Sequence, residues 1–241
     1  MLRRLLPANL AQILKWRIIL RAKRKRLGAP AGPRAVNIAE TREKILKAAI
    51  EQFSQKGLSG ARIESICTEA DVNPRMVYHY FKDKEGLYVA VLEKVLGELR
   101  AEETALDVST SEPFEGLLTM YDFTFGHFAK HPELIRLLSS ENLLEGAFLK
   151  NSVATPIVAS PVVEHIDTLL KRGEATGTVR AGLDPLHLYV VMVGLSYFHK
   201  SNMHTLSVIW NKSITSAAWQ EDHRLLGRDL LATYLKPTPK V

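Results

Sequence analysis

One short stretch decides the fold of this chain: 70-ADVNPRMVYHYFKDKEGLY-88. Proline is tolerated at the first position of a helix, because its missing N–H would have no partner there. Asn73, which precedes Pro74, is a good N-cap, since its side-chain oxygen can accept a hydrogen bond from an N–H two or three residues later. Val72 and Val77 then occupy the two positions of a hydrophobic staple. The stretch therefore predicts a short helix with a fixed start and a fixed orientation.

Positive charge is concentrated at the N-terminus. The 241-residue chain has a net charge of +6, but residues 1–39 hold ten basic residues and no acid, so the rest of the chain is mildly acidic. Such an arm is typical of a segment that binds nucleic acid or a membrane surface. Three other interpretations stay open: a transit peptide, an extension upstream of the true start codon, and a disordered solubilising tail. Charges interrupt every apolar run of 10-LAQILKWRIILRAKRKR-26, which excludes a secretory signal peptide.

The composition is that of an ordinary soluble globular protein. Hydrophobic residues make up 46% of the chain and charged residues 24%, and no apolar run is long enough to span a bilayer. The single cysteine, Cys67, excludes an internal disulfide, and we expect it to be a buried, inert thiol. These features predict a cytoplasmic protein without a cofactor.

Helical patterns run along nearly the whole chain, so the predicted fold class is all-α. Residues 28–36 (GAPAGPRAV) form a breaker, after which Asn37 and Glu40 have the spacing of a capping box. The first helix is predicted to end at Gly57, a natural residue to follow a helix C-terminus. Further helices are predicted over 61–70, from Pro74 onward, and near 84–105, 113–130, 132–146, 160–175, 184–207 and 219–235.

The helix at 61–70, the turn at 71–73 and the helix from Pro74 form a helix-turn-helix unit, with the first helix packed behind them. Val77 and Phe81 are four residues apart and must face inward. The opposite face then carries hydrogen-bonding, aromatic and cationic side chains: Arg75, Tyr78, His79, Tyr80, Lys82 and Lys84. Such groups suit phosphates and base edges, so we predict that this helix enters the major groove of DNA.

Three segments together resemble the DNA-binding domain of the TetR family of bacterial regulators: 41-TREKILKAAIEQFSQKG-57, 63-IESICTEADVN-73 and 77-VYHYFKDKEGL-87. The resemblance implies a three-helix DNA-binding head, a helical body for ligand binding and dimerisation, and repression that a small molecule relieves. We accordingly predict four parts: a basic arm (1–36), a DNA-binding domain (37–84), a ligand-binding and dimerisation domain (85–236) and a tail (237–241).

The same resemblance implies individual DNA contacts. Tyr78 and Lys84 match positions that contact phosphates in the family, and Arg62 lies near a helix start that does the same. Arg75 is our candidate for reading guanine, because arginine pairs with guanine through two hydrogen bonds. The predicted DNA-binding residues are Arg62, Asn73, Pro74, Arg75, Met76, Tyr78, His79, Lys82 and Lys84.

The chain departs from the family pattern at several positions of this unit. Asp71 replaces the usual glycine after the second helix, and Asn73 replaces the common serine. Ala61 stands where a threonine usually opens the second helix, which removes a hydroxyl cap worth about 1 kcal/mol. Pro74-Arg75 stands where many members have a small residue. These departures concern the base-reading positions most directly.

The body also resembles the family, specifically the pyrimidine- and nicotinate-responsive repressors. The resemblance rests on 131-HPELIRLLSSENLLEG-146 and on the spacing of Leu170, Gly173, Gly177, Arg180, Asp184 and Pro185. It implies a ligand pocket, for which the aromatic and polar candidates are Tyr121, Phe125, Glu141, Asn142, Phe148, Tyr197 and His199. Each also has an ordinary interpretation as packing. Glu141 and Asn142 are the strongest pair, because they would otherwise need another buried partner.

A second set of residues is predicted to join two copies of the chain. The run 186-LHLYVVMVGLSYF-198 is too apolar for a helix with a single buried face, so we expect its other face to pack on a twofold-related copy together with the last helix. The interface candidates are Leu195, Phe198, Leu225, Leu226, Asp229 and Ala232.

No metal site is predicted. His127 and His131 are four residues apart, but Pro132 ends the helix there and no third ligand is evident.

The sequence thus predicts a homodimeric transcriptional repressor with three partners: a palindromic duplex operator, a second copy and a small-molecule inducer. An activator of the same fold is the first alternative. An enzyme is a weaker one, because the chain has no P-loop, no dinucleotide fingerprint and no hydrolase motif. A non-specific binder of nucleic acid or membrane through the basic arm is the last.

Overall fold

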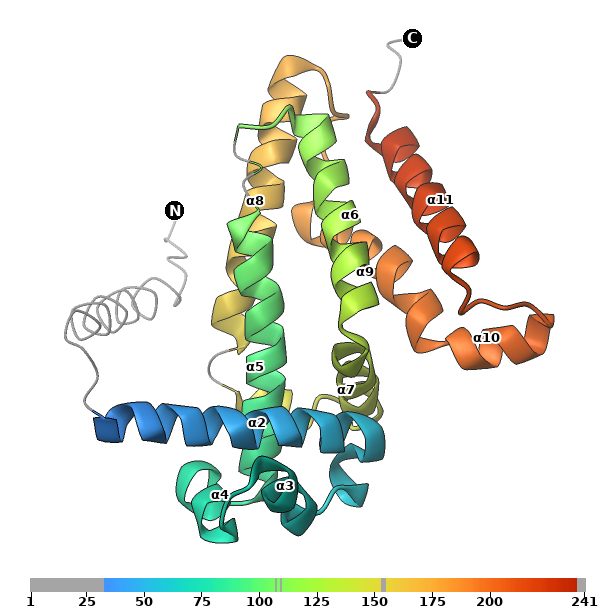
Figure 1. Cartoon of the computed structure of the whole chain (residues 1–241). Coiled ribbons are helices and arrows are strands. Elements are labelled where there is room, and N and C mark those ends of the chain that lie inside the picture. Colours follow the sequence, from blue (N-terminus) through green and yellow to red (C-terminus); the bar gives the residue numbers. More distant parts are fainter. Residues whose placement is uncertain (1–32, 107, 109, 153–154, 238–241) are drawn as a thin grey trace, which may run out of the picture. The chain divides into compact units, whose positions relative to one another are not determined.

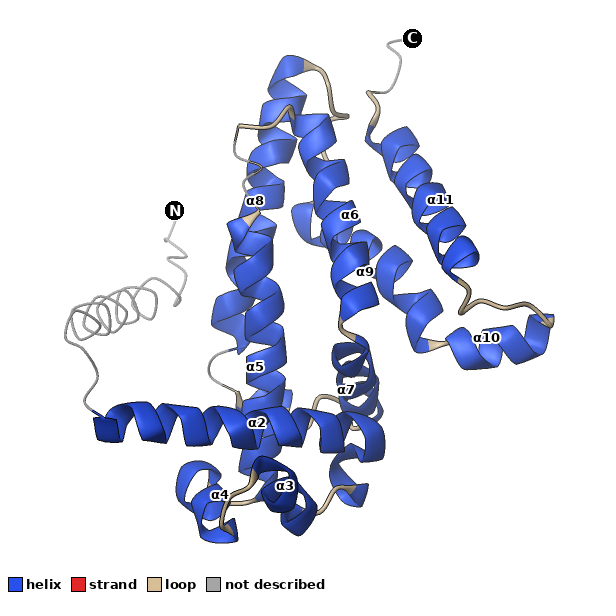
Figure 2. Ribbon diagram, in the orientation of Figure 1, coloured by secondary structure: helices blue, strands red, loops and turns tan. Residues whose placement is uncertain are grey.

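Helices account for all the regular structure in the computed structural model, which describes residues 33–106, 108, 110–152 and 155–237 (Figure 1). No strand occurs among these residues, so the predicted all-α class is confirmed (Figure 2). The chain divides into two units, Met1–Lys44 and Ile45–Val241, and the packing described below lies within the second. None of the described helices is long and apolar enough to cross a lipid bilayer.

The N-terminal helices are α2 (Pro33–Gly60), α3 (Ile63–Ala70) and α4 (Pro74–Phe81). α2 begins before Asn37, so Asn37 and Glu40 lie inside the helix and the predicted capping box is wrong. Proline fits the first turn of a helix, so Pro33 is compatible with this earlier start. The predicted break at Gly57 is confirmed: its φ of 66° and ψ of 178° are non-helical and favour glycine. The predicted basic arm lies almost wholly outside the described residues.

The remaining elements are α5 (Lys84–Ala105), α6 (Pro113–Lys130), α7 (Pro132–Leu143), the short 3₁₀ helix η1 (Leu149–Asn151), α8 (Thr155–Thr176), α9 (Pro185–Ser201), α10 (Met203–Trp210) and α11 (Ala217–Leu235). α5 and α6 have the predicted bounds. Each starts with a side-chain cap: Asp83 accepts from the N–H of Gly86 at 2.7 Å, and Glu112 accepts from the N–H of Glu115 at 3.0 Å.

The predicted start of the helix over 160–175 is wrong. α8 begins at Thr155 and continues through Pro161. A proline inside a helix removes one backbone hydrogen bond. The residues after it, including Val162 and Ile166, are buried in the body, and this packing outweighs the local loss.

Two other boundaries also differ from the prediction. α7 ends at Leu143, since Glu145 and Gly146 both have positive φ. The predicted helix over 184–207 is divided at Asn202, whose side-chain amide donates to the carbonyl of Phe198 at 2.9 Å. A short polar side chain that bonds the backbone in this way competes with the regular helical hydrogen bonds.

One hydrophobic core joins the helix-turn-helix to the lower part of the body. It comprises the second half of α2, α3, α4, most of α5 and the start of α7. Aromatic rings link these parts, because Tyr88 of α5 contacts Phe53 of α2 edge-on at 5.1 Å between centroids, and Phe148 near η1 at 5.3 Å. A shift of α5 is therefore transmitted to α2 and α4 by direct packing.

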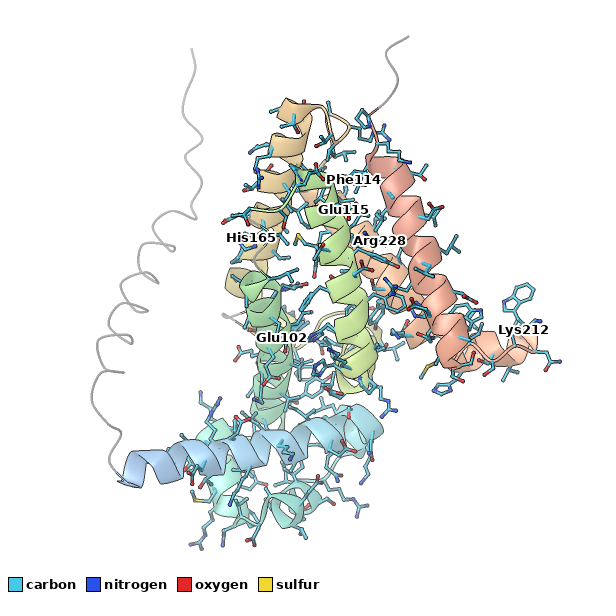
Figure 3. All side chains as sticks on the ribbon, turned by 45° about the horizontal axis from the view of Figure 1, so that its top comes forward. Glu102, Phe114, Glu115, His165, Lys212 and Arg228 are labelled. Carbon is cyan, nitrogen blue, oxygen red and sulfur yellow. The ribbon has the colours of Figure 1, made fainter. Side chains whose placement is uncertain are left out.

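A second core holds the rest of the body together. Its buried residues come mainly from α6, α8, α9 and α11, with Tyr121, Ile166 and Met192 among the most buried. Figure 1 shows α6 between α8 and α11. An ionic network adds to the α6–α11 contact. Asp122 accepts from Arg224 and Arg228 at 2.5 Å each. Arg228 also donates to Glu115 at 2.9 Å, and Figure 3 labels these last two residues.

Candidate nucleic-acid interface and internal cavity

The second helix of the helix-turn-helix starts as its sequence predicts. Asn73 Oδ1 accepts a hydrogen bond from the N–H of Arg75 at 2.9 Å, and Pro74 occupies the first helical position. Val77 and Phe81 are buried in the first core. Asp71 has φ 54° and ψ 52°, the left-handed conformation that explains why glycine is usual here and that aspartate tolerates. These features fix where α4 begins and which face it buries.

The outer face of α4 carries exposed groups that can bind DNA. Arg75 and His79 are exposed, and Tyr78 is 51% exposed. Met76 and Tyr80 are half-buried and pack against the core. Among the predicted DNA-binding residues of α4, Pro74, Arg75, Tyr78 and His79 therefore have exposed side chains, and the side chain of Met76 is partly exposed.

The link between α4 and α5 is tightly constrained. The N–H of Asp83 donates to the carbonyl of Phe81 at 2.9 Å, and Lys82 between them has φ 70° and ψ −53°, a rare and strained γ-turn. A Cβ atom on Gly86 would lie 2.1 Å from the Phe81 carbonyl oxygen. Only glycine allows α5 to start so close to α4, and this geometry leaves Lys82 exposed at the end of α4.

Two further predicted contacts lie beside the recognition helix. Lys84, at the start of α5, is half-buried and donates to the carbonyl of Ser59 at 3.4 Å, which leaves two of its three N–H donors for another acceptor. Arg62 is exposed and occupies the N-cap position of α3 without a side-chain cap bond. The first N–H groups of α3 therefore remain available to an anion.

A cavity of about 800 Å³ lies between the α6–α7 turn and the segment from the end of α9 to α11. Its apolar walls include Phe125, Phe128, Ile135 and Met203. Its polar walls include Ser139, Lys200, Gln220, Glu221 and Arg224, with Arg136 at α7. An apolar cavity with a few polar groups is the usual form of a small-molecule site.

Lys200 is a charged group of the cavity that contacts an uncharged amide and an aromatic ring. Its Nζ donates to Gln220 Oε1 at 2.6 Å and lies 5.0 Å from the centroid of the Phe125 ring. Burial lowers the pKa of Lys200. Arg224, in contrast, is neutralised by Glu221 and Asp122. No carboxylate in the described part of the chain pairs with Lys200, so its ammonium group can bind an anionic ligand.

Of the seven pocket candidates from the sequence, only Phe125 lines this cavity. Tyr121, Tyr197 and His199 lie behind its wall: the hydroxyl of Tyr121 donates to the carbonyl of Arg224 at 3.1 Å, and that of Tyr197 lies 2.7 Å from Ser139 Oγ. Burial raises the pKa of Tyr121 to about 12.

The other three candidates lie away from the cavity. Glu141 is 2% exposed, and its Oε1 accepts from the N–H groups of Phe148 and Leu149 at 2.8 Å each. Asn142 is exposed, and Phe148 packs on Tyr88. The buried partner that Glu141 requires is therefore backbone, which the sequence could not reveal.

His199 is the centre of a ring cluster behind the cavity. It stacks on Phe125 at 5.2 Å between centroids and lies 4.3 Å from His223, which in turn stacks on Trp219 at 4.9 Å. Its Nε2 is 3.0 Å from Gln220 Oε1. Burial, and next the adjacent His223, lower the pKa of His199 to about 4, so the ring is neutral at pH 7.

Exposed apolar side chains follow one line along α9 and another along α11. Those on α9 are Leu186, Val190, Val191 and Phe198, and those on α11 are Leu225, Leu226, Leu230 and Tyr234. Their exposed fractions run from 48% for Val191 and Leu225 to 61% for Phe198, far above those of core residues. Of the other predicted interface residues, Asp229 is exposed, whereas Leu195 and Ala232 are half-buried. Sequence reasoning missed Leu186, Val190 and Leu230. The usable signal was the interval of four residues from Leu186 to Val190, from Val190 to Gly194, from Gly194 to Phe198, and from Leu226 to Leu230.

Comparison with known proteins gives the same assignment for both halves of the chain. Residues 45–91 match the family described as bacterial regulatory proteins, tetR family. Residues 113–230 match a family described as tetracyclin repressor-like, C-terminal domain.

Individual relatives are similar over most of the chain. The HTH-type transcriptional repressor NicS of Pseudomonas putida is 35% identical over 176 residues, which cover 73% of this chain and 83% of NicS. The HTH-type transcriptional regulator RutR of Escherichia coli is 28% identical over 171 residues, 70% of this chain and 77% of RutR. A solved structure from Rhodococcus sp., described as a TetR-family transcriptional regulator, shares the fold with a TM-score of 0.60 at 21% identity, covering 82% of this chain and 100% of that chain.

Proposed function

The chain belongs to the TetR family of DNA-binding transcriptional regulators, and from this we propose that it is a homodimeric repressor that a small-molecule inducer releases from a palindromic operator. The observation that carries the proposal is the capped helix α4, which buries Val77 and Phe81 and exposes Arg75, Tyr78 and His79. The similarity to NicS, which is named a repressor, supports repression over activation.

On DNA, α4 lies in the major groove with its N-terminal residues at the base edges. Arg75 reads guanine through a bidentate pair, and His79 contacts the neighbouring base. Tyr78, Lys82 and Lys84 bind phosphates on either side and set the register of the helix. Arg62 and the free N–H groups at the start of α3 hold a further phosphate.

The dimer forms through the exposed apolar lines of α9 and α11. Contiguous apolar surface of this kind is uncommon on monomers and marks a protein interface. A twofold axis buries the same patch on both copies. It also places two helix-turn-helix units on successive major grooves, about 34–36 Å apart, which requires a near-palindromic operator.

The cavity takes the inducer. Its apolar walls suit a compact organic molecule, and Lys200 favours one that carries an anionic group. The α6–α7 turn forms one wall of the cavity, and α7 packs in the same core as α4 and α5. A ligand in the cavity shifts the equilibrium between two arrangements of the DNA-binding domains, one that binds DNA and one that does not. It weakens DNA binding to the extent that it binds the second arrangement more tightly.

Selection of bound sequences from a random duplex pool tests the proposal, at fixed near-physiological salt and with the full chain alongside a version that lacks residues 1–35. We expect both proteins to select the same palindromic site. The Arg75→Ala variant is the matched control and should lose preference at one base pair in each half-site. Binding without sequence preference that disappears with residues 1–35 would assign the DNA contact to the basic arm and overturn the proposal.

A further inference from the structure

The C-terminal thirds of α5 and α6 bring together a set of metal-ligand side chains that the sequence keeps apart. Glu102 of α5, which Figure 3 labels, meets His127 of α6 and His131, the residue between α6 and α7. Each of the three offers one ligand atom, and these atoms all lie within 4.8 Å of one another. The fold thus supplies the third ligand that is not evident around His127 and His131 in the sequence.

We propose that Glu102, His127 and His131 form a binding site for a divalent transition-metal ion of the zinc type. Two imidazoles and one carboxylate are a ligand set that suits zinc and its neighbours, whereas magnesium and calcium prefer oxygen ligands alone. Three protein ligands leave at least one coordination position for water or a small ligand.

The ligand atoms of Glu102 and His127 already lie about as close together as two ligand atoms of one zinc ion. His127 Nδ1 lies 3.0 Å from Glu102 Oε2. Two ligand atoms that are each bound to zinc at about 2.0–2.1 Å with tetrahedral angles lie roughly 3.3 Å apart. An ion can therefore replace the hydrogen bond between these two groups with little movement of α5 or α6.

His131 completes the set by turning its side chain. Its ring stacks on that of His127 at 4.2 Å between centroids, and its side chain is 37% exposed at the junction of two helices. The side chain therefore has room to bring a nitrogen closer to the other ligand atoms. Glu133 Oε1 lies 2.9 Å from His131 Nδ1, as in sites where a carboxylate orients a ligating histidine through its second nitrogen.

Burial also suits a bound ion. The His127 side chain is 3% exposed, so the protein shields one side of the site, while the Glu102 side chain is 52% exposed and leaves a path from solvent. An ion at this position cross-links α5, α6 and the start of α7. A simple hydrogen bond between Glu102 and His127 would require neither His131 nor the carboxylate of Glu133 beside it.

Metal titration of the whole chain tests the site directly and independently of any DNA binding. The protein is first stripped with a chelator and then titrated with Zn²⁺ by calorimetry and with Co²⁺ by visible absorption. The site variants are Glu102→Gln and His131→Gln, which leave the buried His127 in place. The matched controls are Glu98→Gln, one turn earlier on α5, and His187→Gln on α9, both of which change exposed side chains.

We expect one saturable ion per chain in the wild type and in both controls, with affinity at least about tenfold weaker in both site variants. Thermal unfolding without metal should show that all variants fold. Zn²⁺ should raise the unfolding temperature of the wild type and the controls more than that of the site variants. Absence of saturable uptake by the wild type, or equal affinity in site variants and controls, would overturn the proposal and leave Glu102–His127 as a structural hydrogen bond.

Discussion

Acidification should destabilise this protein through His199. The ring is 2% exposed, stacks on Phe125 and lies beside His223. Burial and His223 lower its pKa from 6.5 to about 4. Because the folded-state pKa is the lower one, the unfolded chain binds a proton first as pH falls. The stability that neutral His199 contributes is therefore complete above about pH 6.5 and is lost progressively down to about pH 4.

The size of this loss follows from the two pKa values. A difference between 6.5 and about 4 corresponds to about 3 kcal/mol in the free energy of unfolding. Most of it should be lost by about pH 4.5. A change of that size is a large fraction of the stability of a typical domain. Other groups titrate in the same range, so the effect of His199 has to be isolated by difference.

Urea unfolding of the wild type and two variants between about pH 7.5 and pH 4.5 isolates the effect of His199. His199→Phe keeps a ring against Phe125 but cannot bind a proton, and His187→Gln removes an exposed histidine as the control. We expect the stability advantage of the wild type over His199→Phe to fall by about 2–3 kcal/mol as pH decreases, with little change relative to His187→Gln. Stability curves for wild type and His199→Phe that stay parallel across this range would refute the reasoning.

Four further substitutions test the recognition helix, its link to α5 and the interface. Arg75→Ala should weaken binding to a selected operator by about 1–3 kcal/mol and relax preference at one base per half-site, measured by fluorescence anisotropy on single-base operator variants. Lys84→Ala should weaken binding to all sequences alike and reduce the slope of log affinity against log salt by about one. Gly86→Ala places a Cβ against the Phe81 carbonyl and should cost about 1–3 kcal/mol of stability in urea unfolding, an idea that an unchanged midpoint would contradict. Leu226→Asp should convert dimers to folded monomers in sedimentation velocity, and an unaltered sedimentation coefficient would place the interface elsewhere.

The DNA-binding half was predictable because its determinants are local. A capping residue and a proline set the start of α4, and the spacing of Val77 and Phe81 sets its buried face. Each depends on neighbours within one or two helical turns, and the structure contains all of them. The errors were also local in origin: Pro161 suggested a helix start, but α8 begins at Thr155 and continues through this proline.

The body was predictable only as a set of helices. Sequence alone determined that it is helical, that its α9 segment has more apolar surface than one face can bury, and that His127 and His131 are four residues apart at the end of a helix. Which side chains meet across helices was decided by the tertiary structure. Glu141 bonds to backbone N–H groups several residues later, and the cavity draws on Lys200 and Arg224 from distant segments. Glu102 of α5 lies close to His127 of α6 and to His131, which follows α6. Helix periodicity fixes which face of a helix is buried, but the partner of that face depends on the packing of the whole chain.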